Sequence, residues 1–208
     1  MKVEVIETAI LGGTFDPIHE GHLAMAHDIL ERELAQEVIF VPSARPPHKT
    51  GKKITPAKER LKMLELAIAG EERFSISDYE IENNYRESYT VHTLNALKSA
   101  MPSRRFKLVI GMDNLHIFHT WYNCKDIIQN FPIIVYGRPG SRKMAEVHLS
   151  ENFNQRMSIR LSKSIVEDGP MNDISATEIR RRTAEGESID HLVPGAVAEY
   201  IKEKGFYK

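Results

Sequence analysis

Two histidines stand just after a pair of glycines near the start of the chain, an arrangement that suits phosphate binding. Gly12 and Gly13 end an apolar segment, and His19 and His22 lie three residues apart around Gly21. Glycines at a turn let backbone N–H groups approach an anion, and the first turn of a following helix adds unpaired N–H groups with a partial positive charge. Imidazoles donate further hydrogen bonds and, when protonated, carry charge. The segment therefore predicts a phosphate site with histidine donors.

Commoner phosphate and metal motifs do not fit this segment. Neither the G-x-G-x-x-G fingerprint nor the G-x-x-x-x-G-K-[ST] loop occurs in the chain. A zinc-protease helix places its histidines four residues apart, whereas here a glycine separates two that are three apart, which makes a poor rigid ligand face. We therefore expect no protein-held metal at these histidines. An ordinary turn with surface histidines is the alternative for either histidine taken alone.

A second segment with phosphate chemistry lies near the C-terminus. Ser175 and Glu178 have the spacing of a capping box, in which the serine accepts a hydrogen bond at the start of a helix. Ser175 and Thr177 would then place hydroxyls at the positive end of that helix, and Arg180, one turn on, could bind a phosphate with two hydrogen bonds. A plain helix cap and a phosphate site are compatible interpretations of this segment.

Further candidate side chains follow a predicted strand or occupy a long loop. Lys49 stands in a proline-rich loop and offers a cation on a stiff backbone. Gly111 and Asp113 follow a predicted strand, where open parallel sheets bind ligands, and Asp113 suits a sugar hydroxyl. His116 and His119 follow at helical spacing, but we expect them to serve the helix surface or packing, because zinc sites need a clearer third and fourth ligand.

Two other segments are ambiguous from the residues alone. Trp121, the only tryptophan, stands beside Tyr122. A tryptophan is more often packed in a core than stacked on a ligand. Arg138 begins an Arg-Pro-Gly sequence after a predicted strand, which is also typical of a plain turn.

Alternating strand and helix patterns position these groups. The apolar run that ends at Leu11 predicts a buried strand, and the apolar residues at 23, 26, 30 and 34 predict a helix after it. Strands are also predicted at 38–41, 74–76, 106–110 and 133–136, with 157–161 as a further candidate, and helical patterns lie among them. Strand followed by helix, repeated, predicts a parallel sheet in an α/β fold.

Composition limits the class of protein. With 208 residues and 41% hydrophobic residues, we expect one domain over 1–208, its C-terminal helical part starting at about 173. The 28 basic and 29 acidic residues give a net charge of −1, which predicts no nucleic-acid or membrane partner. The single cysteine, Cys124, argues for a reducing compartment, so we expect a cytoplasmic protein. The sequence leaves the oligomeric state open, with a homo-oligomer as one alternative.

Taken in order, these segments resemble the nucleotidyltransferase superfamily marked by an (H/T)-x-G-H motif and a later I-S-S-T-x-x-R motif. More closely, the chain is similar to the bacterial nicotinate-nucleotide adenylyltransferases. The resemblance extends over almost the whole chain and includes Gly12 to Leu23, Val41 with Pro46 to Lys49, Arg60 to Ala67, Ser88 to Thr90 with Thr93 and Leu94, Ile110 to Asp113, Trp121 and Tyr122, Arg138 to Gly140, and Ile174 to Arg180.

The resemblance implies a Rossmann-like doubly wound parallel sheet with helices on both faces. It also implies transfer of AMP from ATP to nicotinate mononucleotide, giving the deamidated precursor of NAD and pyrophosphate. Mg²⁺ would be the cofactor, held mainly by the ATP phosphates.

Residue roles follow from the same resemblance. The implied catalytic residues are His19, His22, Lys49 and Arg180. The implied ATP-binding residues are Gly12, Gly13, Thr14, Phe15, Gly111, Asp113, Arg138, Ser175 and Thr177, with Gly111 and Asp113 at a ribose and Arg138 at a phosphate. The acceptor would bind Thr90, Trp121 and Tyr122, with Trp121 stacked on the pyridine ring and the other two at its carboxylate.

Two positions depart from the family pattern. Tyr85-Arg86-Glu87 stands where the family usually has a glycine and a small turn residue, so the shape of the acceptor loop is not implied. Ala176 replaces the second serine of the later motif, which removes at most one hydrogen bond, worth about 1 kcal/mol.

Other functions remain as alternatives. A related adenylyltransferase could prefer nicotinamide mononucleotide or phosphopantetheine as acceptor, although phosphopantetheine offers no pyridine for Trp121. A non-catalytic nucleotide sensor is a rival of another class. An aminoacyl-tRNA synthetase would need a separate tRNA-binding domain and an excess of basic residues. A chain of 208 residues with a net charge of −1 has no room for that domain and no such excess. Zinc that stays bound to the protein in a stoichiometric amount after dialysis would instead indicate a metal-binding protein.

Overall fold

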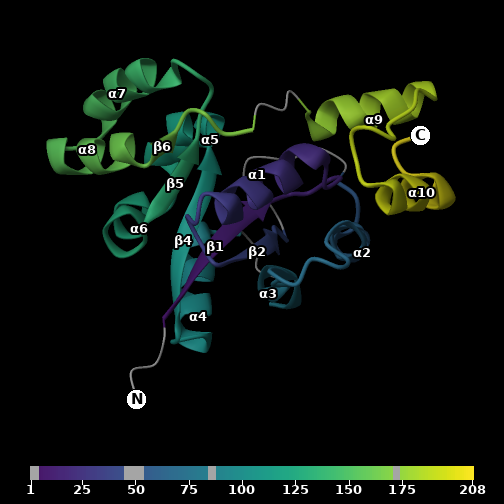
Figure 1. Ribbon diagram of the computed structural model, residues 1–208, viewed down its shortest axis with the longest axis horizontal. Helices are drawn as coiled ribbons and strands as arrows, with labels where there is room; N and C mark the ends of the chain where they lie inside the picture. Colours follow the sequence, from purple (N-terminus) through teal and green to yellow (C-terminus); the bar gives the residue numbers. More distant parts are fainter. Residues whose placement is uncertain (1–4, 45–53, 84–87, 171–173) are drawn as a thin grey trace.

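The centre of the protein is a six-stranded parallel sheet in the order β3-β2-β1-β4-β5-β6 (Figure 1). This computed structural model describes residues 5–44, 54–83, 88–170 and 174–208. The strands are β1 (Ile6–Gly13), β2 (Glu37–Pro42), β3 (Phe74–Ile76), β4 (Arg104–Gly111), β5 (Ile133–Tyr136) and β6 (Ile165–Val166). The chain winds outward in opposite directions from the neighbours β1 and β4, and sheets of this kind bind ligands at the carboxyl ends of the strands at that point.

Helices cover both faces of this sheet. They are α1 (Glu20–Glu31), α2 (Ala57–Ala67), α3 (Tyr79–Glu82), α4 (Thr90–Ala100), α5 (Met112–Ile117), the 3-10 helix η2 (Phe118–Thr120), α6 (Cys124–Asn130), α7 (Ser141–Asn152), α8 (Gln155–Lys163), α9 (Ala176–Glu185) and α10 (Gly195–Lys204). One buried cluster joins the sheet to α4 through α8, and the other joins it to α1, α2, α9 and α10. The predicted doubly wound α/β fold is therefore confirmed.

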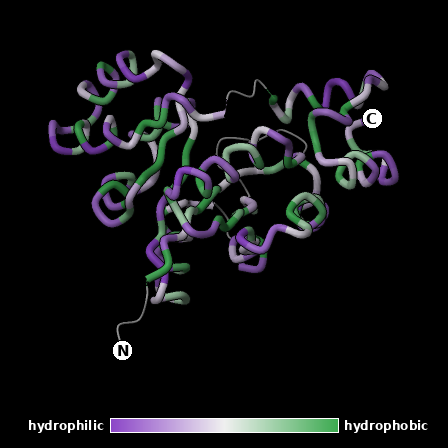
Figure 2. The backbone as a smooth tube through the Cα atoms, viewed as in Figure 1, coloured by the Kyte–Doolittle hydropathy of each residue, from purple (hydrophilic) through white to green (hydrophobic). Residues whose placement is uncertain are grey.

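The strands alternate between these two clusters because successive side chains of a strand point to opposite faces. In β4, Leu108 and Ile110 pack in the cluster with α4 to α8, whereas Val109 packs in the cluster with α1. Figure 2 shows the consequence as hydrophobic residues along the strands and hydrophilic residues along the outer sides of the helices. The sheet is buried on both faces, as expected for a parallel sheet.

The strand predicted at 157–161 is wrong, because this segment lies within the helix α8. Apolar residues at 157, 159 and 161 alternate as in a strand, but Met157 and Leu161 are one helical turn apart and only these two are buried, while Ile159 is 49% exposed. The side chain of Asn154 accepts a hydrogen bond from the Met157 N–H and caps the helix. The Asn154 cap and the helical spacing of the two buried residues therefore favour a helix, although the apolar residues alternate.

The last two helices pack on the same face of the sheet as α1. Ile179 of α9 and Val197 of α10 are fully buried in the same cluster as Ala9 and Leu11 of β1. In Figure 1 these helices form the right-hand side of the molecule, with the C-terminus between them, and α10 contacts α2. Within the described ranges, the structure contains no helix long and apolar enough to cross a membrane.

Candidate functional site

The loop after β1 is anchored by Phe15. This residue has a φ of 48°, in the left-handed region, and its ring is buried against Phe40. A Cβ on Gly13 would lie 2.9 Å from the Phe15 ring, so the loop requires glycine there. The Phe15 side chain therefore belongs to the core, and the prediction that this residue binds ATP concerns its backbone N–H.

The two motif histidines lie together at the start of α1. His19 caps the helix, and its backbone N–H donates to Nδ1 of His22 at 3.3 Å. The two rings are stacked with centroids 3.7 Å apart, and the Phe15 ring lies edge-to-face with that of His22, with centroids 5.0 Å apart. Burial lowers the pKa of His19 to about 4. His19 is therefore neutral near pH 7 and offers a phosphate an N–H donor rather than a positive charge.

The buried state of His19 predicts a pH dependence of stability. Because folding favours the neutral imidazole, stability should be complete above the ordinary pKa of 6.5 and should fall as the pH drops from there towards 4. Between about pH 7 and about pH 5 this shift corresponds to a loss of about 2 kcal/mol. Urea unfolding at both pH values should show that His19→Asn, which keeps a capping side chain, reduces the difference by that amount. An unchanged difference would contradict the assignment.

Arg180 joins the predicted C-terminal phosphate segment to this loop. Its Nη1 donates to the backbone carbonyl of Asp16 at 2.7 Å, and its Nη2 donates to Oγ1 of Thr177 at 3.2 Å. Ser175 caps α9 by accepting a hydrogen bond from the Glu178 N–H, which confirms the predicted cap. Ser175 and Thr177 are exposed. Two segments about 160 residues apart in sequence thus meet at one loop.

The predicted nucleotide residues beyond β4 lie at the same edge of the sheet. Gly111 ends β4 and caps α5, and Asp113 stands exposed in the first turn of that helix. Gly111 pairs with Tyr136 at the end of β5, and Arg138 follows two residues later, also exposed. Because β1, β4 and β5 are consecutive neighbours in the sheet, these groups and the glycines of β1 stand at the adjacent carboxyl ends of three strands.

Aromatic contacts bring the predicted acceptor residues together. Thr90 begins α4, and the ring of the preceding Tyr89 lies 4.7 Å from that of Tyr122, which is 49% exposed. The Trp121 and Phe118 rings pack edge-to-face with centroids 5.1 Å apart. Trp121 is therefore partly buried against the core, as expected for a tryptophan with a packing role. Its Nε1 is buried and has no hydrogen-bond partner in the described structure.

Comparison with known proteins identifies the family. Residues 10–182 match the family model described as cytidylyltransferase-like. The chain belongs to this family. It is 39% identical over 205 residues to a probable nicotinate-nucleotide adenylyltransferase from Dehalococcoides mccartyi, with 97% of each chain covered. It is 37% identical over 207 residues to one from Clostridium botulinum, covering 98% of this chain and all of that protein.

The fold also matches that of a solved structure. The nicotinic acid mononucleotide adenylyltransferase of Plasmodium falciparum, solved in complex with NaAD, superposes with a TM-score of 0.73 over 97% of both chains. At 18% sequence identity this likeness shows the shared architecture. The resemblance predicted from the motifs is confirmed by the family match and by the near full-length relatives.

Some predicted features lie outside the described residues. Lys49, the predicted loop cation, falls within 45–53, and the departure from the family pattern at Arg86 falls within 84–87.

His116 and His119 are described, and the centroid of each ring lies 5.4 Å from that of His148. Within the described part of the chain, no three His, Cys, Asp or Glu side chains are placed to hold a metal ion.

Among the described residues, no group of three acidic, histidine or cysteine side chains is placed to hold the Mg²⁺ that the family resemblance implies. The carboxylate of Asp16 already accepts hydrogen bonds from the Tyr207 hydroxyl and the Thr55 N–H. Mg²⁺ usually keeps several waters and binds phosphate oxygens rather than a protein cage. The donor set of the described residues is compatible with an ion carried on the triphosphate.

Arg60 supports the loop after β1, a role that the sequence did not predict. It is only 1% exposed, and its guanidinium donates to the carbonyls of Thr14, Ser43 and Thr55 at 2.6, 2.8 and 3.0 Å. Burial lowers the pKa of Arg60, and nearby Asp16 opposes this effect. A signal was present in the sequence, since Arg60 lies on the same helical stripe as the buried Met63 and Leu64.

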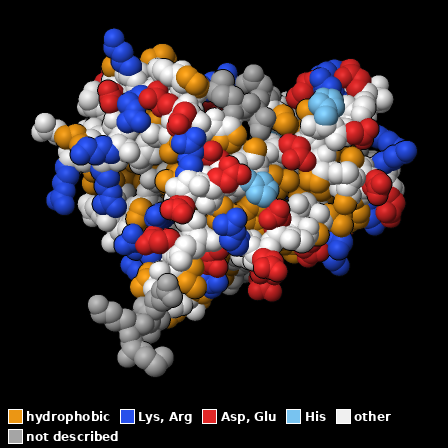
Figure 3. Space-filling view, in the orientation of Figure 1, with side chains coloured by type: hydrophobic (Ala, Val, Ile, Leu, Met, Phe, Trp, Pro, Cys, Tyr) orange, Lys and Arg blue, Asp and Glu red, His pale blue; other side chains and the backbone are white. Residues whose placement is uncertain are grey.

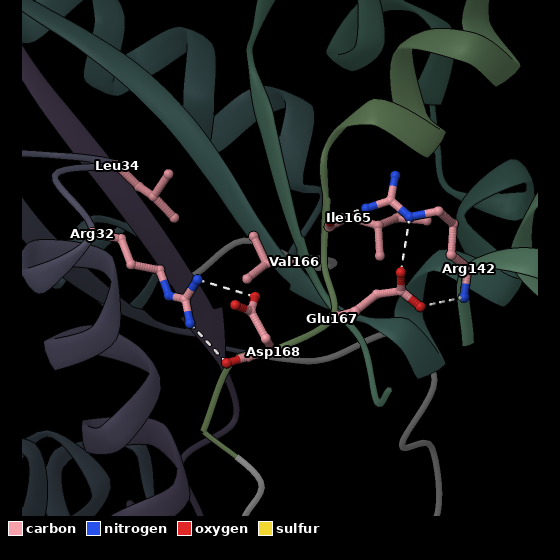
Figure 4. Close-up of a pocket in the computed structure, with 7 residues that line it drawn as sticks. All are labelled: Arg32, Leu34, Arg142, Ile165, Val166, Glu167 and Asp168. Atoms are coloured by element: carbon pink, nitrogen blue, oxygen red, sulfur yellow. Dashed lines mark hydrogen bonds and ion pairs between the residues drawn. The ribbon is translucent and has the colours of Figure 1, made fainter. Parts of the chain in front are cut away.

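A cavity of about 560 Å³ lies away from these groups, between the end of α1 and the segment after β6 (Figure 4). Its charged side chains are paired: Arg32 with Asp168 at 3.0 Å, and Arg142 with Glu167 at 3.0 Å. None of the predicted site residues lines it. Its ion pairs hold the segment that leads from β6 towards α9, and we assign it no part in the chemistry.

The surface charge has no broad basic face in the view of Figure 3. Over its middle and right, the described acidic and basic side chains are interspersed. Basic side chains gather at the left edge, where α7 and α8 lie. This distribution is compatible with a small anionic substrate held by a local group of donors.

Proposed function

We propose that the protein transfers AMP from ATP to nicotinate mononucleotide, forming nicotinate adenine dinucleotide and pyrophosphate. The observation that carries the proposal is the contact between Arg180 and the Asp16 carbonyl, because it joins two phosphate-binding segments at the end of β1. The relatives from D. mccartyi and C. botulinum bear the name of this activity at 37–39% identity over nearly the full chain.

The chemistry requires donors more than it requires a base. The phosphate of the mononucleotide is already an anionic nucleophile, so its oxygen can attack the α-phosphorus of ATP as the bond to pyrophosphate breaks in line. A neutral, buried His19 suits the role of hydrogen-bond donor to a phosphate oxygen. His22, the backbone N–H groups of residues 13–15, Arg180 and Lys49 would complete the stabilisation of the transferring group and of pyrophosphate.

The remaining residues would position the two nucleotides. Asp113 and Gly111 would contact the ribose of ATP, Arg138 would contact a nucleotide phosphate, and Ser175 and Thr177 would hold the triphosphate from the start of α9. Mg²⁺, bound mainly by triphosphate oxygens and water, would neutralise part of their charge. We also propose that the chain acts as one domain in the cytoplasm, with a homo-oligomer left as an alternative.

The acceptor site predicts a preference for the acid over the amide. Backbone N–H groups near Tyr122 and the hydroxyl of Thr90 are donors that suit a carboxylate, whereas an amide places its own donor against them. With ATP and Mg²⁺, nicotinate mononucleotide should therefore release pyrophosphate with a kcat/KM at least about tenfold above that of nicotinamide mononucleotide. Comparable values for the two acceptors would overturn this preference.

A single panel also tests the function itself. Pyrophosphate release is measured with nicotinate mononucleotide, nicotinamide mononucleotide and phosphopantetheine as acceptors and with no acceptor. We expect pyrophosphate release with nicotinate mononucleotide to exceed release in every other sample. Release that is greatest with phosphopantetheine would indicate a different transferase, and ATP binding without release in any sample would indicate a nucleotide sensor.

A further inference from the structure

The C-terminal tail of the chain ends in a contact with the phosphate loop. Beyond α10, Tyr207 adopts a φ of 64°, and its hydroxyl donates to Oδ1 of Asp16 at 2.7 Å. A left-handed conformation is unfavourable for a bulky residue, so surrounding contacts must hold it. Asp16 is only 5% exposed, and its Oδ2 accepts a hydrogen bond from the Thr55 N–H at 3.3 Å.

Asp16 connects this tail to a group with a proposed role in catalysis. The side chain of Asp16 accepts from Tyr207, and its backbone carbonyl accepts from Nη1 of Arg180 at 2.7 Å. His19, three residues further along the chain, begins α1. A shift of Asp16 would therefore displace Arg180 and the segment that leads to His19.

We propose that Tyr207 is a positioning residue for AMP transfer, a C-terminal latch that acts through Asp16 on Arg180 and on the loop before His19. The latch rests on the proposed function for its effect on turnover. Its hydrogen bond and its effect on loop geometry do not depend on the identity of the acceptor.

The protonation of Tyr207 supports a lasting donor role. Burial, first of all, raises the pKa of the hydroxyl well above its usual range. The Asp16 carboxylate raises it further, while a hydrogen bond with Thr55 opposes the shift. The hydroxyl therefore keeps its proton under physiological conditions and remains a donor to Asp16. A hydrogen bond from a hydroxyl to a buried carboxylate is among the stronger side-chain contacts.

The chain provides a matched control in Tyr200. Its hydroxyl donates to Oε2 of Glu59 at 2.6 Å, so a tyrosine from the same C-terminal part also binds a carboxylate. The hydrogen bond to Glu59 raises the pKa of Tyr200 to about 12. This pair joins α10 to α2 and includes none of the residues between β1 and α1. A purely structural tether predicts similar effects when either hydroxyl is removed.

The test compares Tyr207→Phe with Tyr200→Phe, each of which removes only a hydroxyl. In the nicotinate mononucleotide reaction, Tyr207→Phe should lower kcat about tenfold with a smaller change in the two KM values, because displaced catalytic groups cost up to about 10²-fold. Tyr200→Phe should leave kcat within about twofold. Equal kcat values for Tyr207→Phe and the unmodified protein, or an equal loss in both variants, would overturn the latch.

A second measurement does not depend on turnover. Amide hydrogen exchange across 13–22 should be faster in Tyr207→Phe than in the unmodified protein and unchanged in Tyr200→Phe, and equal exchange in all three would reject the latch. If the unmodified protein shows no turnover, that result would count against the proposed function alone. Amide hydrogen exchange would still show whether Tyr207 holds the loop. In an Asp16→Asn background, Tyr207→Phe should add almost nothing, whereas additive losses would contradict action through Asp16.

Discussion

Replacement of His22 by alanine should lower kcat by about 10²–10³-fold while the protein remains folded, because removal of one preorganised donor to a transferring group has an effect of that size. His22 is the better test of the two motif histidines, since His19 is buried and its replacement also changes stability. The His22 ring stacks on His19 and lies edge-to-face with Phe15, so its replacement leaves Phe15, the buried anchor of the loop, in place.

His27 provides the control on the same helix. Its ring packs near Phe74, and its Nε2 lies 3.8 Å from a carboxylate oxygen of Glu71, away from the loop. His27→Ala should leave kcat within about twofold, with at most a small loss of stability. A folded His22→Ala variant with nearly normal kcat would remove His22 from the mechanism.

Replacement of Arg60 by methionine should lower the free energy of unfolding by about 3–5 kcal/mol, because each buried carbonyl left without a donor costs about 1–3 kcal/mol. The side chain would retain its bulk, but the carbonyls of Thr14, Ser43 and Thr55 would each lose a donor. Arg60→Lys should recover only part of the loss, because one ammonium group cannot reproduce the planar arrangement of guanidinium donors. Urea unfolding at constant pH measures these differences.

Lys62→Met is the comparison on the same helix. Lys62 is half-exposed and pairs with Glu65 at 3.2 Å, so its replacement should change stability by less than about 1 kcal/mol. If Arg60→Met is equally mild, the three carbonyl contacts of Arg60 do not stabilise the loop as the structure indicates.

Most of the sheet could be predicted from the sequence because its strands are short apolar runs buried on both faces. The predicted bounds at 74–76 and 133–136 match β3 and β5. The segment 157–161 failed because five residues with alternating apolar side chains fit a strand and an amphipathic helix equally well. Only the cap at Asn154 and the packing of the sheet decide between them.

The site could be predicted where its chemistry is concentrated in short motifs. The loop after β1, the cap at Ser175 and the turn after β4 were found from residue types and spacing. Arg60, Asp16 and Tyr207 were missed as a supporting group because their hydrogen bonds join segments that no local pattern relates. The neutral state of His19 was also missed, since it depends on burial that only the folded structure shows.

The most direct test of the proposed AMP transfer follows the α-phosphorus of ATP. The unmodified protein is incubated with Mg²⁺, nicotinate mononucleotide and ATP labelled at that phosphorus, and the products are separated. We expect the label to appear in a dinucleotide in amounts equal to the unlabelled pyrophosphate released. Label that remains in ATP, or that appears as free AMP with no dinucleotide, would contradict the proposed transfer.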